Sequence, residues 1–130
     1  MTVLDASAAV PVLADEPEGR PVLAALEDEL FVSVPDHFHA EALSGVRGLA
    51  IGGKLARTDA TAAIERLRQL RVMSFPALEL VRDIWALRHE LTVYDAAYLA
   101  LARSLDTQLI TLDAGLAAVA KREGRLAATR

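Results

Sequence analysis

The chain has no cysteine among its 130 residues. It therefore has no disulfide framework, no thiolate zinc site and no cysteine nucleophile, and its stability must come from packing. No uncharged run approaches the roughly 20 residues needed to cross a bilayer. The N-terminus reaches Asp5 without a positively charged region ahead of an apolar run, so we expect no signal peptide. These absences predict a soluble, cytoplasmic protein with no membrane partner.

Basic residues are outnumbered by acidic ones, with 14 Lys and Arg against 18 Asp and Glu and a net charge of -4 at pH 7. A protein that holds nucleic acid through phosphate contacts alone has the opposite sign of charge. Charge by itself thus disfavours a nucleic-acid partner. The chain is 53% hydrophobic, enough to fill one compact core, and no repeat or long linker divides it. We expect a single domain over residues 1–130.

Short β-favouring runs alternate with longer Ala- and Leu-rich segments of helical period, a pattern typical of βα units around a parallel sheet. The predicted strands are 2–5, 31–34, 71–75 and 108–112, with a weaker fifth at 126–129. The predicted helices are 8–14, 21–29, about 37–51, one capped by Thr58, 78–90, 94–104 and 114–122. The sequence therefore favours an α/β fold.

The helix ends are marked by residues that cap helices. Asp36 is a candidate cap for helix 37–51, and Gly52-Gly53 provides a left-handed end for it. Thr58 is the candidate cap of the next helix. These signals predict a helical hairpin after the second strand. The apolar segment 8–13 fits either an interface or the core.

Two of the predicted strands end in a carboxylate: Asp5 closes the first and Asp113 closes the fourth. In an open parallel sheet, ligands bind beyond the carboxyl ends of the strands, so the two acids could share one site. Each also stands directly before a helix, where Asp is a favoured N-cap. Taken alone, either residue is better explained as a cap, and Ser7 carries the same ambiguity.

Two further acids stand in helical segments. Asp95 is the only charge in the stretch 91–102, which suggests a partner for it, although Thr92 and Asp95 also have the spacing of a capping box. Glu41 lies at the border of an apolar helical stripe and, taken alone, is an ordinary surface residue. His37 and His39 are two residues apart and do not face one another on a helix, so they do not indicate a zinc site.

Four segments of the sequence, taken in their order along the chain, resemble the motifs of a known family. They are Val3-Leu4-Asp5-Ala6-Ser7, Pro35 with Glu41, Tyr94-Asp95-Ala96-Ala97-Tyr98-Leu99-Ala100-Leu101-Ala102, and Leu109-Ile110-Thr111-Leu112-Asp113. Together they resemble the PIN-domain family, and in particular the VapC-type toxin ribonucleases of type II toxin–antitoxin systems. The Tyr-Asp-Ala-x-Tyr-Leu-Ala-Leu-Ala block is the most specific of the four. One departure is Ala114-Gly115 after the last acid, where relatives often carry a polar or basic residue.

The resemblance implies a three-layer α/β/α fold, with a parallel sheet of four or five strands, helices on both faces and a helical hairpin after strand two. It implies a metal-dependent endoribonuclease that is neutralised by a VapB-type antitoxin and forms a homodimer. The implied catalytic and metal-binding residues are Asp5, Glu41, Asp95 and Asp113. A non-catalytic PIN-like module that only binds RNA or protein is the alternative. Intact acids at all four positions favour the enzyme.

Four carboxylates in one crevice would repel one another unless a cation intervened, and oxygen ligands select a hard cation, here Mg²⁺ or Mn²⁺. Ser7 and Thr111 are candidates to hydrogen-bond a ligand carboxylate, and a purely structural role fits them equally. The nearest basic cluster for RNA is Arg47, Lys54 and Arg57, which also fits a solvated helix face. Setting the four acids aside leaves 14 acidic against 14 basic residues. We therefore expect RNA binding to be modest and metal-dependent.

Overall fold

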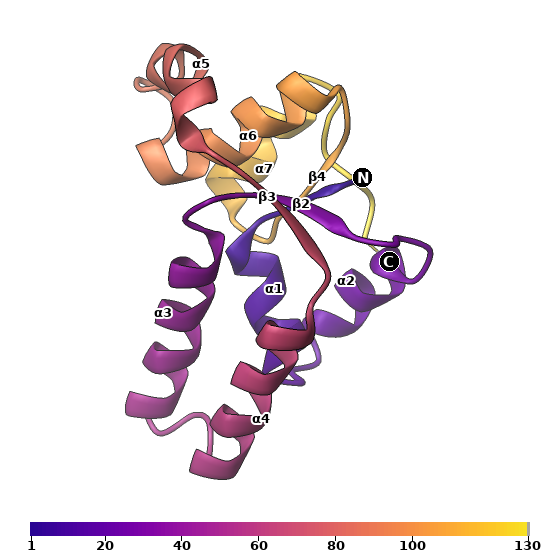
Figure 1. Cartoon of the computed structure of the whole chain (residues 1–130), viewed down its shortest axis with the longest axis vertical. Coiled ribbons are helices and arrows are strands. Elements are labelled where there is room, and N and C mark those ends of the chain that lie inside the picture. The colour runs from indigo at the N-terminus through magenta and orange to yellow at the C-terminus, as the bar shows by residue number, and fades with distance from the viewer. Residues whose placement is uncertain (130) are drawn as a thin grey trace.

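A parallel four-stranded sheet forms the centre of the computed structural model, which describes residues 1–129. The strands are β1 (Val3–Leu4), β2 (Val32–Pro35), β3 (Val72–Phe75) and β4 (Leu109–Ile110). Their order is β3-β2-β1-β4, with Val3 opposite both Ser33 and Leu109 (Figure 1). Each of the four strands lies inside or beside its predicted range, and the parallel α/β prediction is confirmed.

Helices cover both faces of this sheet (Figure 1). The helical elements are α1 (Ala6–Leu13), α2 (Gly19–Leu26), α3 (Phe38–Ile51), α4 (Arg57–Gln69), the 3-10 helix η1 (Ala77–Leu80), α5 (Val81–Ala86), α6 (Val93–Leu105) and α7 (Ala114–Arg122). Helices α1 to α4 lie on one side of the strands and α5 to α7 on the other. The α3–α4 pair is the predicted hairpin. Within residues 1–129, no helix has the length and apolar character needed to span a membrane.

Two predicted elements differ from the structure. The weak fifth strand is absent as a strand, because the chain after α7 makes only an isolated parallel bridge between Leu126 and Leu109. The predicted helix 78–90 is instead η1 followed by α5. After α5 the chain forms successive tight turns whose hydrogen bonds join residues three apart. Arg88 N–H donates to Trp85 O, and Glu90 N–H donates to Leu87 O. A regular α-helix does not continue through such turns.

The helix caps were only partly predicted. Asp36 and Thr58 are not N-caps, because the N-cap of α3 is His37, one residue after Asp36, and the N-cap of α4 is Ala56, two residues before Thr58. The extended backbone of Ala56 lets the helix start before the Thr58 hydroxyl. The glycine end of α3 is confirmed, since Gly53 takes a φ of 75°, a conformation that favours glycine.

The core lies between the sheet and the helices on each side. Seven consecutive residues of α6, from Ala96 to Ala102, are buried, as expected for a helix that is apolar almost all round. In α1, Ala8, Ala9 and Leu13 are buried within the chain. Half of the apolar segment 8–13 therefore belongs to the core, while Val10, Pro11 and Val12 are partly exposed.

Close packing of α1 against α3 depends on a glycine. A Cβ added at Gly45 would lie 2.6 Å from Cγ2 of Val10, whereas at Gly48, one turn further along α3, it would meet nothing within 4 Å. We expect Gly45→Ala to destabilise the protein by about 1–3 kcal/mol through overpacking. We expect Gly48→Ala to stabilise it by about 1 kcal/mol, because alanine is the better helix former. Urea unfolding of both variants checks the pair, and equal effects would contradict this packing.

Candidate functional site

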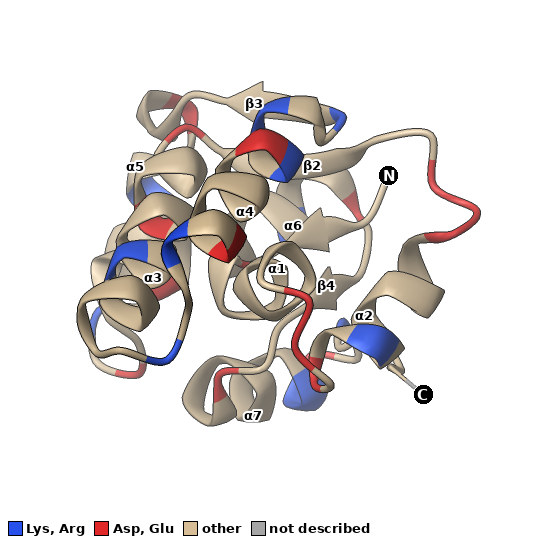
Figure 2. Cartoon of the chain, turned by 90° about the horizontal axis from the view of Figure 1, so that it is seen from below, with Lys and Arg blue, Asp and Glu red and all other residues tan. Residues whose placement is uncertain are grey.

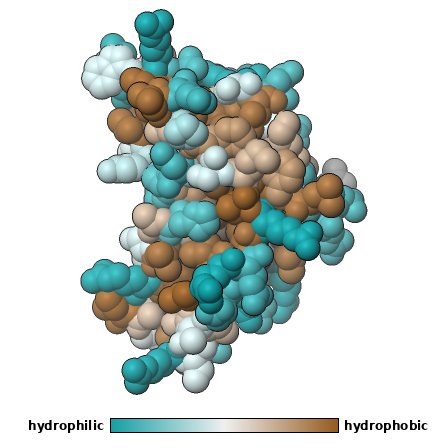
Figure 3. All heavy atoms as spheres, viewed as in Figure 1, coloured by the Kyte–Doolittle hydropathy of each residue, from teal (hydrophilic) through white to brown (hydrophobic). Residues whose placement is uncertain are grey.

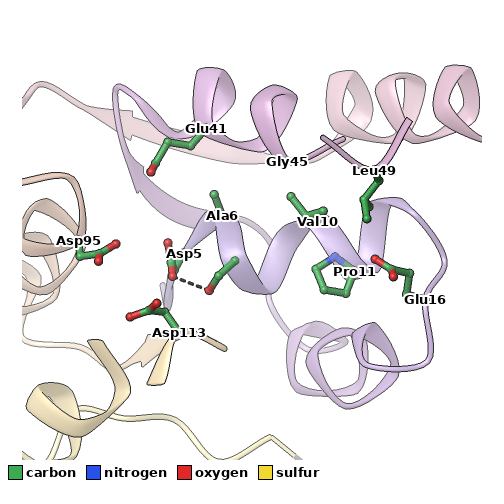
Figure 4. Close-up of a pocket in the computed structure, with 11 residues that line it drawn as sticks. Asp5, Ala6, Val10, Pro11, Glu16, Glu41, Gly45, Leu49, Asp95 and Asp113 are labelled. Carbon is green, nitrogen blue, oxygen red and sulfur yellow. Dashed lines mark hydrogen bonds between the residues drawn. The ribbon is translucent and has the colours of Figure 1, made fainter. Parts of the chain in front are cut away.

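The four acids singled out in the sequence line one pocket of about 380 Å³ (Figure 4). Asp5 follows β1 and Asp113 follows β4, while Glu41 and Asp95 stand in the first turns of α3 and α6. In Figure 4, the side chains of Asp5, Asp95 and Asp113 point toward one another, and Glu41 approaches from the helix above them. Residues up to 108 positions apart in the sequence therefore share one site.

The sheet topology explains this convergence. Strands β1 and β4 are parallel neighbours, so their carboxyl ends lie at the same edge of the sheet. The strand order also changes direction at β1. Strands β2 and β3 extend the sheet on one side of β1, and β4 lies on its other side. Such a switch point leaves a crevice at the carboxyl ends of the strands. Asp5 and Asp113 flank this crevice.

Asp5 is almost fully buried, with 3% of its surface exposed. It occupies the N-cap position of α1, yet its side chain makes no capping hydrogen bond. Instead, its Oδ2 accepts from Ser7 Oγ at 2.6 Å and from Thr111 Oγ1 at 2.7 Å. Ser7 Oγ and Thr111 Oγ1 also accept from the backbone N–H groups of Leu112 and Asp113. The two hydroxyls thus join Asp5 to the loop that carries Asp113.

Charge accumulates in this pocket without a basic side chain in its lining. Burial raises the pKa of Asp5, and the hydrogen bonds from Ser7 and Thr111 only partly oppose that rise. Burial also raises the pKa of Asp95, and the negative charges of Asp113 and Asp5 raise it further. The folded protein therefore holds these carboxylates at a cost, which a bound cation would offset.

Asp95 and Asp113 also have the helix-end contacts that the sequence allowed. Thr92 Oγ1 accepts from the backbone N–H of Asp95, and Asp113 Oδ2 accepts from Leu116 N–H at 2.8 Å. Asp113 is therefore a true N-cap. Capping uses only Oδ2 of Asp113, and its Oδ1 makes no hydrogen bond within residues 1–129. Asp113 can therefore cap α7 and line the pocket at the same time.

Glu41 is fixed by two groups that sequence reasoning did not connect to it. The hydroxyl of Tyr98 donates to Glu41 Oε1 at 2.7 Å, and His37 Nε2 lies 3.0 Å from the same oxygen, close enough for an ion pair though not aligned as a hydrogen bond. Burial pushes the pKa of Glu41 upward, but the contacts with His37 and Tyr98 outweigh it and the pKa is lowered. Helical spacing could have revealed His37, which is four residues before Glu41. The contact with Tyr98 joins two different helices and does not follow from spacing.

The rest of the pocket follows α1 away from the acids. Val10, Pro11 and Leu49 provide apolar walls, and Glu16 lies at the far end (Figure 4). The basic residues Arg47, Lys54 and Arg57 do not line this pocket. They belong to the α3–α4 hairpin, where Figure 2 shows Lys and Arg side by side with acidic residues.

The α3–α4 hairpin also has apolar side chains on its surface. Arg47 lines a second groove between these helices, whose other walls include Leu43, Val46 and Ile64. The space-filling view shows apolar residues reaching the surface in the lower part of the molecule, where this hairpin lies (Figure 3). The hairpin surface is therefore mixed in character rather than uniformly basic.

The side chains are not gathered into a finished metal site. Over residues 1–129, no three His, Asp or Glu side chains are grouped closely enough to hold a metal ion. The donor set nonetheless fits a hard divalent cation in kind, since it consists of carboxylates and nearby hydroxyls. Both Asp5 and Asp113 have one oxygen engaged with the protein and one without a hydrogen bond in the described chain. A cation would have to draw the side chains together.

Comparison with known proteins places this chain in a family. The family model described as the PIN domain matches residues 2–122. The chain belongs to the PIN-domain family. It is 37% identical over 113 residues to VapC ribonuclease Mb0985 of Mycobacterium bovis, covering 87% of this chain and 86% of that protein. It is 36% identical over 117 residues to ribonuclease VapC1 of Mycobacterium tuberculosis, covering 89% and 88%.

A solved structure agrees with the PIN-domain assignment. The crystal structure of PAE2754 from Pyrobaculum aerophilum superimposes with a TM-score of 0.66 at 25% identity, covering 92% of this chain and 79% of that one. The predicted resemblance to the PIN-domain family and to VapC ribonucleases is therefore confirmed, as is the α/β fold with its parallel sheet.

Proposed function

We propose that this PIN-domain protein is a VapC-type endoribonuclease that cleaves RNA with the help of Mg²⁺ or Mn²⁺ held by Asp5, Glu41, Asp95 and Asp113. The observation that carries the proposal is the convergence of these carboxylates from four separate segments on one pocket at the carboxyl edge of the sheet. The raised pKa values of Asp5 and Asp95 support it, because they indicate a site that favours a bound cation.

Each acid has a role that follows from its contacts. Asp5 is the most rigidly held, and its free Oδ1 is the first choice for a direct ligand. Asp95 stands opposite it and is the second direct ligand, while Asp113 binds through Oδ1 or through water. Glu41 approaches from α3 and either orients water or binds a second cation. The chemistry that a bound divalent cation supplies is activation of water and neutralisation of charge on the phosphate.

The reaction is hydrolysis of a phosphodiester bond. Water adds to the phosphorus, the P–O3′ bond breaks, and the products carry a 5′-phosphate and a 3′-hydroxyl. Since the pocket has no basic lining residue, RNA affinity there depends on the cation. Similarity to VapC ribonucleases supports a VapB-type antitoxin as the partner that blocks the pocket, a homodimeric assembly and a cytoplasmic location.

The proposal is tested by incubating the protein with single-stranded RNA in Mg²⁺, in EDTA, and in EDTA followed by excess Mg²⁺. We expect cleavage only where free Mg²⁺ is present, and a phosphatase-sensitive 5′ end on the downstream fragment. Cleavage that persists in EDTA would overturn the metal mechanism. RNA binding without metal-dependent cleavage would favour a non-catalytic binding module instead.

A further inference from the structure

Tyr98 is a buried residue with a polar group directed at the site. Its side chain has 0% exposed surface and stands on α6, three residues after Asp95 and therefore on a neighbouring position of the same helix face. Its hydroxyl donates to Glu41 Oε1 at 2.7 Å. A buried hydroxyl needs a hydrogen-bond partner, and here a glutamate on a different helix supplies it.

His37, the N-cap residue of α3, also lies close to Glu41 Oε1. Its Nε2 lies 3.0 Å from Glu41 Oε1, and its ring packs edge-on against Tyr98, with 5.2 Å between ring centroids. Both groups therefore act on Oε1. In the described chain, Oε2 receives no hydrogen bond, and Glu41 lines the acidic pocket. A flexible side chain is thereby held by one oxygen while the other stays available to the pocket.

We propose that Tyr98 is a positioning residue that acts through Glu41, with His37 as a second support. The Tyr98 hydroxyl holds Oε1 so that Oε2 faces the carboxylates of Asp5 and Asp95 and completes the cation site. This inference rests on the proposed function, because it assigns Tyr98 to the same metal site. It extends the set of functional residues to a group that does not line the pocket itself.

The chain offers a matched pair of variants for the test. Tyr98→Phe removes the hydroxyl that contacts Glu41. Tyr94→Phe makes the same change one turn earlier on α6, at a side chain that is 63% exposed and whose hydroxyl makes no hydrogen bond in the described chain. The readout is Mn²⁺ affinity, measured by electron paramagnetic resonance of free Mn²⁺ without RNA. We expect Tyr98→Phe to weaken Mn²⁺ binding about 10- to 100-fold, the usual effect of losing an outer-shell partner. We expect Tyr94→Phe to leave it unchanged.

A double-mutant cycle separates positioning from a general structural role. In a Glu41→Gln background, we expect Tyr98→Phe to cause no further loss of Mn²⁺ affinity, because the residue through which it acts has already been changed. The same loss in both backgrounds would overturn the inference. If Tyr98→Phe does not fold, His37→Phe serves in its place, since it keeps a ring against Tyr98 but removes Nε2, and we expect weakened binding there too.

The outcomes also distinguish this inference from the proposed function. Wild-type protein that binds no Mn²⁺ would contradict the proposed function and this inference with it. Wild-type protein that binds Mn²⁺ and cleaves RNA, together with a Tyr98→Phe protein of unchanged affinity, would overturn the inference alone.

Discussion

We expect replacement of Asp5 with asparagine to lower the rate of RNA cleavage by about 1000-fold or more. A metal ligand supplies several kcal/mol of transition-state stabilisation, and each 1.36 kcal/mol corresponds to a factor of ten in rate. Asparagine keeps an oxygen that can accept from Ser7 and Thr111, whose hydrogen bonds tie Asp5 to the loop after β4. The variant therefore loses charge while the local fold is kept. Single-turnover cleavage of a labelled RNA in saturating Mg²⁺ measures the effect.

The control for this variant is Asp59→Asn. It removes the same charge from an exposed position in the first turn of α4, outside the acidic pocket. We expect its cleavage rate to stay within a factor of two or so of the wild type, as for a typical surface substitution. An Asp5→Asn protein that is folded by circular dichroism and cleaves as fast as Asp59→Asn would remove Asp5 from the catalytic set.

We expect Mg²⁺ to raise the melting temperature of the protein by on the order of 10 °C at a concentration 100 times its dissociation constant. Binding to the folded state alone contributes about 2.7 kcal/mol under that condition, and 1 kcal/mol corresponds to roughly 4 °C in a domain of this size. Thermal unfolding in Mg²⁺ and in EDTA measures the shift. A melting temperature that is unchanged by Mg²⁺ would contradict a cation site in the pocket.

Asp95→Asn has two opposite effects in the same assay. Without metal, we expect the variant to melt at a higher temperature than the wild type, because burial and the charges of Asp113 and Asp5 make the Asp95 carboxylate unfavourable in the folded state. With Mg²⁺, we expect the variant to gain much less than the wild type, because a ligand is lost. A variant less stable than the wild type in EDTA would show that the Asp95 carboxylate stabilises the first turn of α6, as an ordinary acidic residue near a helix N-terminus does.

The pH dependence of the metal-free protein follows from the same shifts. The folded-state pKa values of Asp5 and Asp95 are raised, so near these values the folded state binds more protons than the unfolded state. Their contribution therefore increases stability as the pH falls from neutral through the folded pKa values. Glu41 has a lowered pKa and contributes in the opposite direction, losing stability as the pH falls through its folded value. We expect the stability of the metal-free Asp95→Asn variant to increase less than that of the wild type as the pH falls below neutral.

Much of the fold was predictable because strands and helices alternate with clear periods. Where the prediction failed, local signals were overridden by their surroundings. Thr58 is a good capping residue, but the N-cap of α4 is Ala56, two residues earlier, where the backbone is extended. The segment at Leu126 was the weakest of the predicted strands, and it pairs with β4 only through one bridge.

The four acids of the candidate site were predictable from the sequence, but the contacts that hold them in place were not. Chain position and strand ends pointed to the four acids, and the pocket contains all of them. The support of Glu41 depends on Tyr98, which is 57 residues away in the sequence, so only the packing of α6 against the strands and α3 could reveal it. Likewise, the contact of Thr111 with Asp5 depends on the pairing of β1 with β4.

A crystal structure of the protein with Mn²⁺, in which anomalous scattering locates the ion, tests most directly whether the acidic pocket holds a cation. We expect an anomalous peak in the acidic pocket, bound by Asp5 and Asp95, with the side chain of Asp113 or Glu41 moved closer than in the metal-free arrangement. RNA cleavage by a protein that has no ion in this pocket at millimolar Mn²⁺, or has one bound elsewhere, would contradict it.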